Sequence, residues 1–157
     1  RFLDCDIVGF DYSGYGISST AAAIALVAET QAPVAGVILL APLASMMRVL
    51  LRKRLCFGQP FARRTPCIDK FRSIEKIALV NAPVLVCHGT ADVVVPIEHG
   101  EAIYAKAPNT VPPLWIAGAG HWNLKNSREL WVRVRHFLHN ELTPSGASIA
   151  SSQPAAP

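Results

Sequence analysis

An acid and a histidine, Asp92 and His121, stand where two apolar runs of the sequence end. Asp92 closes the string His-Gly-Thr-Ala-Asp, and His121 closes the string Gly-Ala-Gly-His. A histidine that acts as a general base needs its second ring nitrogen held by a carboxylate, because that contact fixes the tautomer and stabilises the imidazolium. Either residue alone would be interpreted as an ordinary loop residue. Together they predict an acid–base pair that activates a hydroxyl nucleophile.

The elements that must position this pair alternate along the chain. Short runs rich in Val, Ile and Leu predict strands at residues 6–11, 34–41, 83–88 and 113–117. Helices are predicted at residues 21–29, which are rich in alanine, at 43–55, at 73–80 by their helical spacing, and at 96–105 behind Pro96. This alternation is typical of an α/β fold, a mostly parallel sheet flanked by helices, whose chemistry gathers past the carboxyl ends of the strands. We therefore expect Asp92 and His121 within about 6 Å of each other.

A last helix is predicted near the end of the chain. Asn126 and Glu129 have the spacing of a capping box, and Pro96 suits the first position of the helix before it. Behind the capping box, one apolar stripe follows helical spacing and consists of Leu130, Val134, Phe137, Leu138 and Leu142. We expect this stripe to pack on the sheet.

Length and composition indicate one domain. The chain has 157 residues, of which 51% are hydrophobic and 17% charged, and this excludes a disordered main body, a coiled coil and a disulfide miniprotein. The domain is expected at residues 1–142, followed by a disordered low-complexity tail of Pro, Ala, Ser and Gly at 143–157. The net charge of +4 comes without a basic motif interleaved with aromatics, so no nucleic-acid partner is expected. The first residue is Arg1, and we interpret the sequence as a fragment.

The sequence lacks the motifs that would indicate a metal site, a redox-active cysteine pair or a dinucleotide cofactor. The four cysteines form no Cys-x-x-Cys pair, so no metal site or thioredoxin-like centre is expected, and Cys5 and Cys87 are interpreted as buried thiols. The glycines at 14 and 16 are followed by Ser19 where a dinucleotide fingerprint has its third glycine, and we expect no cofactor. Among the other histidines, His88 is expected to bond backbone within its loop. Three are expected to be solvated on helices: His99, His136 and His139.

Two segments raise the question of a membrane. Residues 30–47 carry no charge over a length that could span a bilayer, but Pro33, Gly36 and Pro42 favour a buried strand instead, and no secretory signal opens the chain. The basic stretch at 43–64 is open to two interpretations, a solvated helix face or a contact with an anionic membrane surface.

Three segments resemble the family-seventeen α/β-hydrolase-domain proteins: residues 11–19 (DYSGYGISS), 87–92 (CHGTAD) and 113–121 (PLWIAGAGH). Residues 40–49 and 68–77 are similar to the family's middle section, so the resemblance runs from about residue 5 to 142. It implies a partial α/β-hydrolase fold, with Asp92 and His121 as the acid and base of a Ser-His-Asp triad in the chain order of that fold. It also implies a serine hydrolase that cleaves palmitoyl thioesters on other proteins at the cytoplasmic side of membranes, where the family is held by an N-terminal lipidated cysteine cluster that is absent here.

The chain departs from the family where the nucleophile should be. The family's Gly-x-Ser-x-Gly elbow, expected between residues 11–19 and 34–41, is missing, as are its opening strands and its His-Gly oxyanion loop. This suggests an exon-skipped, truncated or wrongly assembled product that is inactive alone. Ser18, in a Gly-x-Ser-x-Thr string, is a weak candidate for the nucleophile, while Ser13, Ser45 and Ser148 lack the strand–turn–helix setting. The alternative function is a non-catalytic hydrolase-like remnant that binds a partner protein or an anionic membrane surface.

Overall fold

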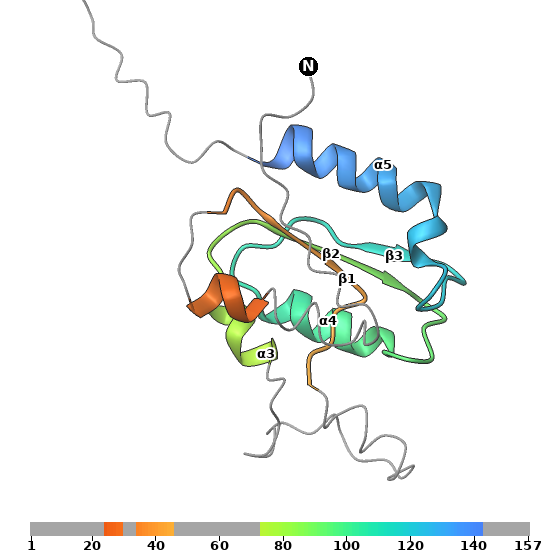
Figure 1. Ribbon diagram of the computed structural model, residues 1–157, viewed down its shortest axis with the longest axis horizontal. Helices are drawn as coiled ribbons and strands as arrows, with labels where there is room; N and C mark the ends of the chain where they lie inside the picture. The colour runs from red at the N-terminus through yellow and green to blue at the C-terminus, as the bar shows by residue number, and fades with distance from the viewer. Residues whose placement is uncertain (1–23, 30–33, 46–72, 143–157) are drawn as a thin grey trace, which may run out of the picture.

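Three parallel strands form a sheet at the centre of the structure (Figure 1), a computed structural model that describes residues 24–29, 34–45 and 73–142. The strands are β1 (Val37–Leu40), β2 (Val84–Gly89) and β3 (Leu114–Ile116), in the spatial order β1-β2-β3. Val37 pairs with Val84, and Cys87 pairs with Leu114. The α/β class with a parallel sheet is thereby confirmed. The strands β1 and β3 are four and two residues shorter than predicted, and β2 is shifted by one residue.

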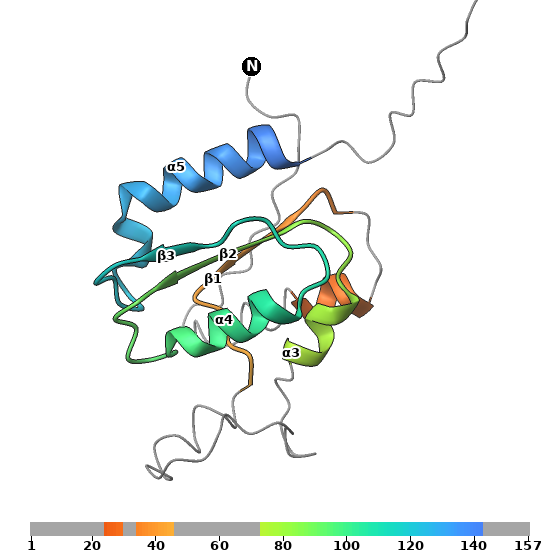
Figure 2. The same ribbon diagram turned by 180° about the vertical axis from the view of Figure 1, so that it is seen from behind.

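Helices cover both faces of the sheet. The helices are α3 (Ser73–Lys76), α4 (Ile97–Lys106) and α5 (Arg128–His136), and residues 24–29 are also helical. Shorter turns follow or precede them at η1 (Ile77–Leu79), η2 (Leu124–Asn126) and the π-helical η3 (Phe137–Glu141). Figures 1 and 2 show α5 on one face of the sheet, with α3 and α4 on the other. The described residues thus form three layers.

The central strand β2 shows why the layers hold together. Its Val84 and Val86 side chains join the core on the α4 side, whereas Leu85 and Cys87 join the core on the α5 side. All six of its residues are buried. A strand covered on both faces needs apolar residues at every position, and this produces the uninterrupted apolar run from which the strand was predicted.

The apolar stripe of the last helix packs on the sheet as expected. Leu130 and Phe137 are fully buried against Leu85 and Cys87, and three partly buried residues pack beside them: Val134, Leu138 and Leu142.

The capping box predicted from Asn126 and Glu129, by contrast, is wrong. Asn126 is the last residue of η2, and Ser127 stands at the N-cap of α5 without a side-chain hydrogen bond. Because a 3₁₀ turn comes first, the helix begins one residue later than the capping box required.

The remaining helix predictions differ from the structure at their ends. Pro96 precedes α4 with an extended ψ of 147° instead of occupying its first position. The helix predicted at 73–80 divides into α3 and η1. Residues 43–45 follow β1 as a buried, non-helical segment, so the helix predicted at 43–55 does not include them. The rest of that segment, the strand at 6–11, most of the basic stretch and the tail at 143–157 lie outside the described residues.

The uncharged stretch at 30–47 contains β1. No helix in the part of the chain that the structure describes combines the length and hydropathy needed to cross a bilayer.

Candidate acid–base site

Asp92 lies in the loop that leaves β2, with its side chain fully buried. One carboxylate oxygen, Oδ1, accepts hydrogen bonds from the backbone N–H groups of Val94 at 2.9 Å and Val95 at 2.8 Å. These two donors belong to the loop's own turn, as is common for an aspartate two or three residues before them. They fix the orientation of the carboxylate and leave its second oxygen, Oδ2, for another partner.

That partner is His121, in the loop that leaves β3. Its Nδ1 lies 2.8 Å from Asp92 Oδ2, so the predicted proximity of the two side chains is confirmed. With Nδ1–H donating to the carboxylate, a neutral ring keeps Nε2 as its free basic nitrogen. The His121 side chain is 9% exposed, whereas that of Asp92 is 0% exposed. A buried acid therefore orients a histidine whose ring reaches the surface.

Backbone contacts hold the two loops together. The N–H groups of Thr90 and Ala91 donate to the carbonyl oxygens of Ile116 at 3.0 Å and Ala119 at 2.9 Å. A Cβ placed on Gly89 would lie only 2.2 Å from the carbonyl oxygen of Ala119. The glycine of the His-Gly-Thr-Ala-Asp string is therefore required by the close approach of the two backbones.

The glycines before His121 shape its turn. Gly118 has a φ of +70°, a conformation that favours glycine, and its N–H donates to Thr90 Oγ1 at 3.0 Å. The N–H of Gly120 donates to Asn123 Oδ1 at 2.7 Å, which closes the turn around the histidine. These bonds place the His121 ring over the Asp92 carboxylate.

His88 supports the acid from inside the sheet. It is fully buried, and its Nε2–H donates to the carbonyl oxygen of Val95 at 2.8 Å, within the loop as predicted. The distance from this nitrogen to Asp92 Oδ2 is 3.6 Å. Burial lowers the pKa of His88 from its usual 6.5 and keeps the ring neutral, while its Nδ1 has no partner among the described atoms. His88 thus anchors Val95, whose own N–H holds Asp92.

Two of the three histidines expected on helix surfaces lie there, and one does not. His136 and His139 are exposed. His99 is only 1% exposed, and its Nδ1 accepts the backbone N–H of Ala44 at 3.3 Å, so the prediction for His99 is wrong. The segment after β1 packs against α4 and needs an acceptor for this buried N–H, a requirement that the helical pattern of α4 does not reveal.

Cys87 is the buried thiol that was predicted. It lies on the α5 side of β2, and burial raises its pKa to about 12. The thiolate is therefore strongly disfavoured, and Cys87 is unsuited to act as a nucleophile.

None of the candidate serines is placed beside the acid–base pair in the part of the chain that the structure describes. Ser13, Ser18 and Ser148 lie outside the described residues, and Ser45 is fully buried after β1. Within the described ranges, no group of three or more His, Cys, Asp or Glu side chains could hold a metal ion.

Sequence reasoning missed Trp122, the residue that follows His121. Its ring meets the imidazole edge to face, with 5.2 Å between centroids, and 79% of the residue is exposed. The available signal was a large aromatic residue in a loop otherwise composed of small and polar residues.

Comparisons with known proteins place the chain among hydrolase-fold proteins. It is 34% identical over 179 positions to alpha/beta hydrolase domain-containing protein 17C of Xenopus tropicalis, covering 91% of this chain and 55% of the relative. It is 33% identical to the human 17C protein, with 91% and 52% covered, and 30% identical to human 17B, with 89% and 58% covered. The chain thus spans about half the length of the curated relatives that it matches. No family model matches it.

Solved structures with this fold include three at low sequence identity. Rv0554 from Mycobacterium tuberculosis has a TM-score of 0.58 at 15% identity, with 80% of this chain and 63% of that chain covered. MGS-MChE2, an alpha/beta hydrolase enzyme from a lagoon-sediment metagenome, has a TM-score of 0.55 at 16% identity, with 78% and 57% covered. The monoacylglycerol lipase of Paleococcus ferrophilus has a TM-score of 0.54 at 16% identity, with 77% and 65% covered. The described sheet and helices are therefore part of an α/β-hydrolase fold.

Proposed function

We propose that this chain, which is related in sequence to the family-seventeen α/β-hydrolase-domain proteins and has a partial α/β-hydrolase fold, carries the acid and the base of a serine hydrolase. The observation that carries the proposal is the 2.8 Å contact between His121 Nδ1 and Asp92 Oδ2 at the carboxyl ends of two adjacent parallel strands. The chain order, with the acid before the histidine, is that of α/β-hydrolase triads.

The pair suits the proton transfers of acyl transfer. His121 Nε2 would take the proton of a hydroxyl as its oxygen attacks an acyl carbonyl, and would then return the proton to the leaving group. Asp92 holds the ring in the required tautomer and stabilises the imidazolium. Because Asp92 is buried and His121 reaches the surface, only the base is open to a substrate.

For the substrate we propose the thioester of a palmitoylated protein, on the strength of the sequence relationship. In that reaction the bond between the acyl carbon and the cysteine sulfur breaks, and the sulfur leaves with the proton from His121. Water then releases the fatty acid from the acyl-enzyme, with the same histidine as the base. Because its Nδ1 is held by Asp92, His121 presents Nε2 to the reacting groups in both steps.

The nucleophile is the missing part. No Gly-x-Ser-x-Gly string occurs anywhere in the 157 residues. The match to the Xenopus tropicalis 17C protein extends over 179 positions, more than this chain contains, so that relative has internal residues without a counterpart here. We therefore propose that the chain by itself turns over esters and thioesters at or near the uncatalysed rate, since loss of the nucleophile alone costs about 10⁶ in kcat in a well-studied serine hydrolase.

Labelling with a serine-directed fluorophosphonate tests this proposal. We expect no stoichiometric labelling of the purified chain, and no difference between the parent, Ser18→Ala and His121→Ala. Ser148→Ala serves as the matched control, since it removes a hydroxyl from the tail. Labelling that both Ser18→Ala and His121→Ala abolish, while Ser148→Ala leaves it intact, would refute inactivity and make Ser18 the nucleophile.

The alternative is a remnant whose role is binding alone. It predicts that His121→Ala changes neither labelling nor partner binding. Restoring a Gly-x-Ser-x-Gly segment between residues 19 and 20 separates the two functions, because only a retained acid–base pair would then give labelling that depends on His121.

A further inference from the structure

Exposed apolar side chains gather around the acid–base pair and on the neighbouring helix. Of the six large apolar residues that are exposed in the described part of the chain, four belong to this region: Val93 at 85%, Trp122 at 79%, Val132 at 62% and Trp131 at 55%. Val93 follows Asp92 and Trp122 follows His121. Trp131 is fixed to the turn after the His121 loop, because its Nε1–H donates to the carbonyl oxygen of Lys125 at 2.8 Å.

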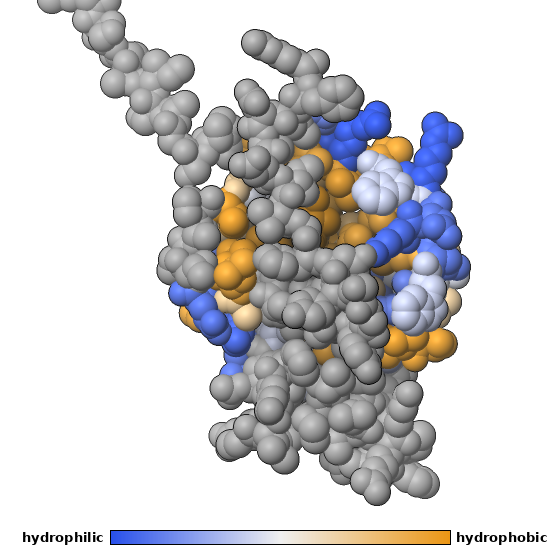
Figure 3. Space-filling view, viewed as in Figure 1, coloured by the Kyte–Doolittle hydropathy of each residue, from blue (hydrophilic) through white to orange (hydrophobic). Residues whose placement is uncertain are grey.

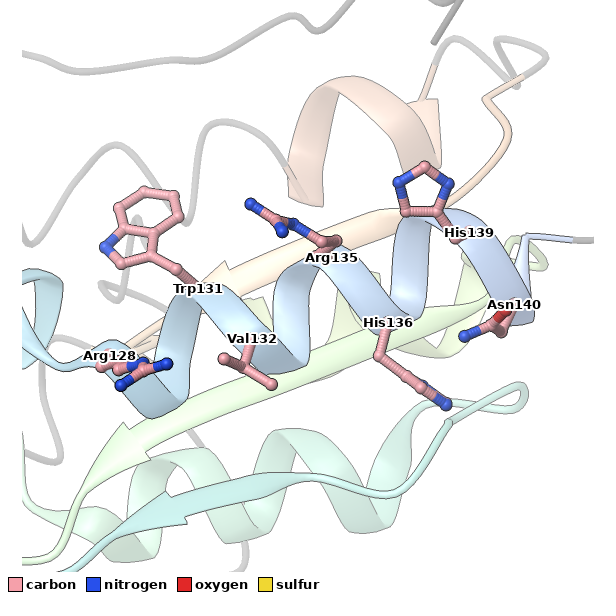
Figure 4. Close-up of a pocket in the computed structure, with 7 residues that line it drawn as sticks. All are labelled: Arg128, Trp131, Val132, Arg135, His136, His139 and Asn140. Atoms are coloured by element: carbon pink, nitrogen blue, oxygen red, sulfur yellow. The ribbon is translucent and has the colours of Figure 1, made fainter. Parts of the chain in front are cut away.

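Basic side chains share the outer face of α5 with these apolar ones. Figure 4 shows Trp131, Arg135 and His139 along one edge of the helix and Arg128, Val132 and His136 along the other. They border a shallow depression of about 530 Å³ whose lining includes no carboxylate. In Figure 3, hydrophilic side chains over α5 are interrupted by apolar and intermediate ones. We call these six residues the α5 face.

Glu141 is the carboxylate that compensates part of the positive charge on and beside the α5 face. Arg133, on the inner side of the helix, pairs with Glu141 at 2.9 Å, and the same carboxylate accepts from His136 at 3.0 Å. Arg128 and Arg135 form no ion pair within the ranges that the structure describes. Two guanidinium groups are thus available to an anionic partner, next to an exposed indole.

We propose that the α5 face docks on an anionic lipid surface. Guanidinium groups bind phosphate oxygens through two parallel N–H donors, and indole rings prefer the headgroup level of a bilayer, where one side is apolar and the other wet. An acidic protein would also attract the arginines, but it would not account for Trp131 and Val132 exposed between them. The combination of charge and exposed apolar area favours lipid.

Docking in this way brings the acid–base pair, which lies at the end of the sheet where α5 begins, close to the bilayer. Val93 and Trp122, beside Asp92 and His121, lie at the carboxyl edge of the sheet, and Trp131 is tied to the turn that continues from that edge. A fatty acyl group anchored in the membrane would then approach His121 along the exposed apolar side chains of Val93 and Trp122. The docking itself depends on surface residues alone, so it is tested separately from the proposed chemistry.

Co-sedimentation with vesicles tests the role of the arginines. The full chain should bind phosphatidylcholine vesicles that contain a minority of phosphatidylserine, and bind pure phosphatidylcholine weakly. Arg128→Gln with Arg135→Gln should weaken binding about 30-fold, since each cation close to an anionic bilayer contributes about fivefold. The matched control, Lys76→Gln with Lys106→Gln, removes the same charge from α3 and α4 on the opposite face of the sheet and should retain binding. An equal loss in both double variants would refute the α5 face as the contact, because net charge alone would then explain binding.

Fluorescence quenching by brominated lipid tests the tryptophans. Quenching should occur in the parent and be largely lost in the variant with Trp122→Phe and Trp131→Phe, which retains only Trp115 in β3. Parent fluorescence that bromine does not quench, or binding to an acidic peptide such as polyglutamate in place of vesicles, would overturn the proposal.

Discussion

Replacing Gly89 with alanine should push apart the two loops that carry Asp92 and His121. The added Cβ would lie 2.2 Å from the carbonyl oxygen of Ala119 and 2.7 Å from its carbonyl carbon. These are backbone atoms, so no side-chain rotation relieves the contact. The loops must separate by roughly 1 Å to reach van der Waals distance.

The free-energy cost follows from the bonds that join the same loops. Overpacking costs about 1–3 kcal/mol, and the bonds from Thr90 to Ile116 and from Ala91 to Ala119 contribute about 0.5–1.5 kcal/mol each. We expect Gly89→Ala to lower the free energy of unfolding by about 2–6 kcal/mol, a large share of the 5–15 kcal/mol of a typical domain. His121 is two residues from Ala119, so its bond to Asp92 should lengthen as well.

Denaturant unfolding and NMR measure the two effects. The free energy of unfolding comes from a urea titration, and the downfield signal of the His121 Nδ1 proton reports its bond to Asp92. Gly120→Ala is the matched control in the same site, because its Cβ would meet only Ala91 O at 3.7 Å and Asn123 Oδ1 at 3.8 Å. If Gly89→Ala unfolds within about 0.5 kcal/mol of the parent, where surface substitutions usually fall, the argument from backbone contact is refuted.

Two further results are expected. Cys87, whose pKa burial raises to about 12, should resist thiol reagents in the folded chain and react only in denaturant, as peptide mapping would show; modification of the folded chain would contradict its burial. Because burial lowers the pKa of His88, the unfolded state binds more protons below about pH 6.5, so stability should fall as the pH decreases through that value. Unfolding titrations should show a smaller pH dependence for His88→Gln, and an unchanged slope would argue against a neutral His88.

Local sequence patterns determined the layers and the acid–base pair. The apolar runs predicted β1, β2 and β3 because a strand covered on both faces admits few polar residues. Parallel strands direct their carboxyl ends to one edge, so the order of Asp92 and His121 along the chain was enough to predict their contact.

Tertiary structure decided how the remaining side chains are used. His99 looked like a solvated helix residue, but it accepts the N–H of Ala44, 55 positions away. Asn126 had the spacing of a cap, but the turn η2 places Ser127 at the start of α5. Helical spacing puts Arg128, Trp131 and Arg135 on one face of α5, but this face is exposed because the opposite side of the helix packs on the sheet. Residue spacing encodes which face of an element is apolar, whereas the partner of a buried polar atom depends on which distant segment packs against it.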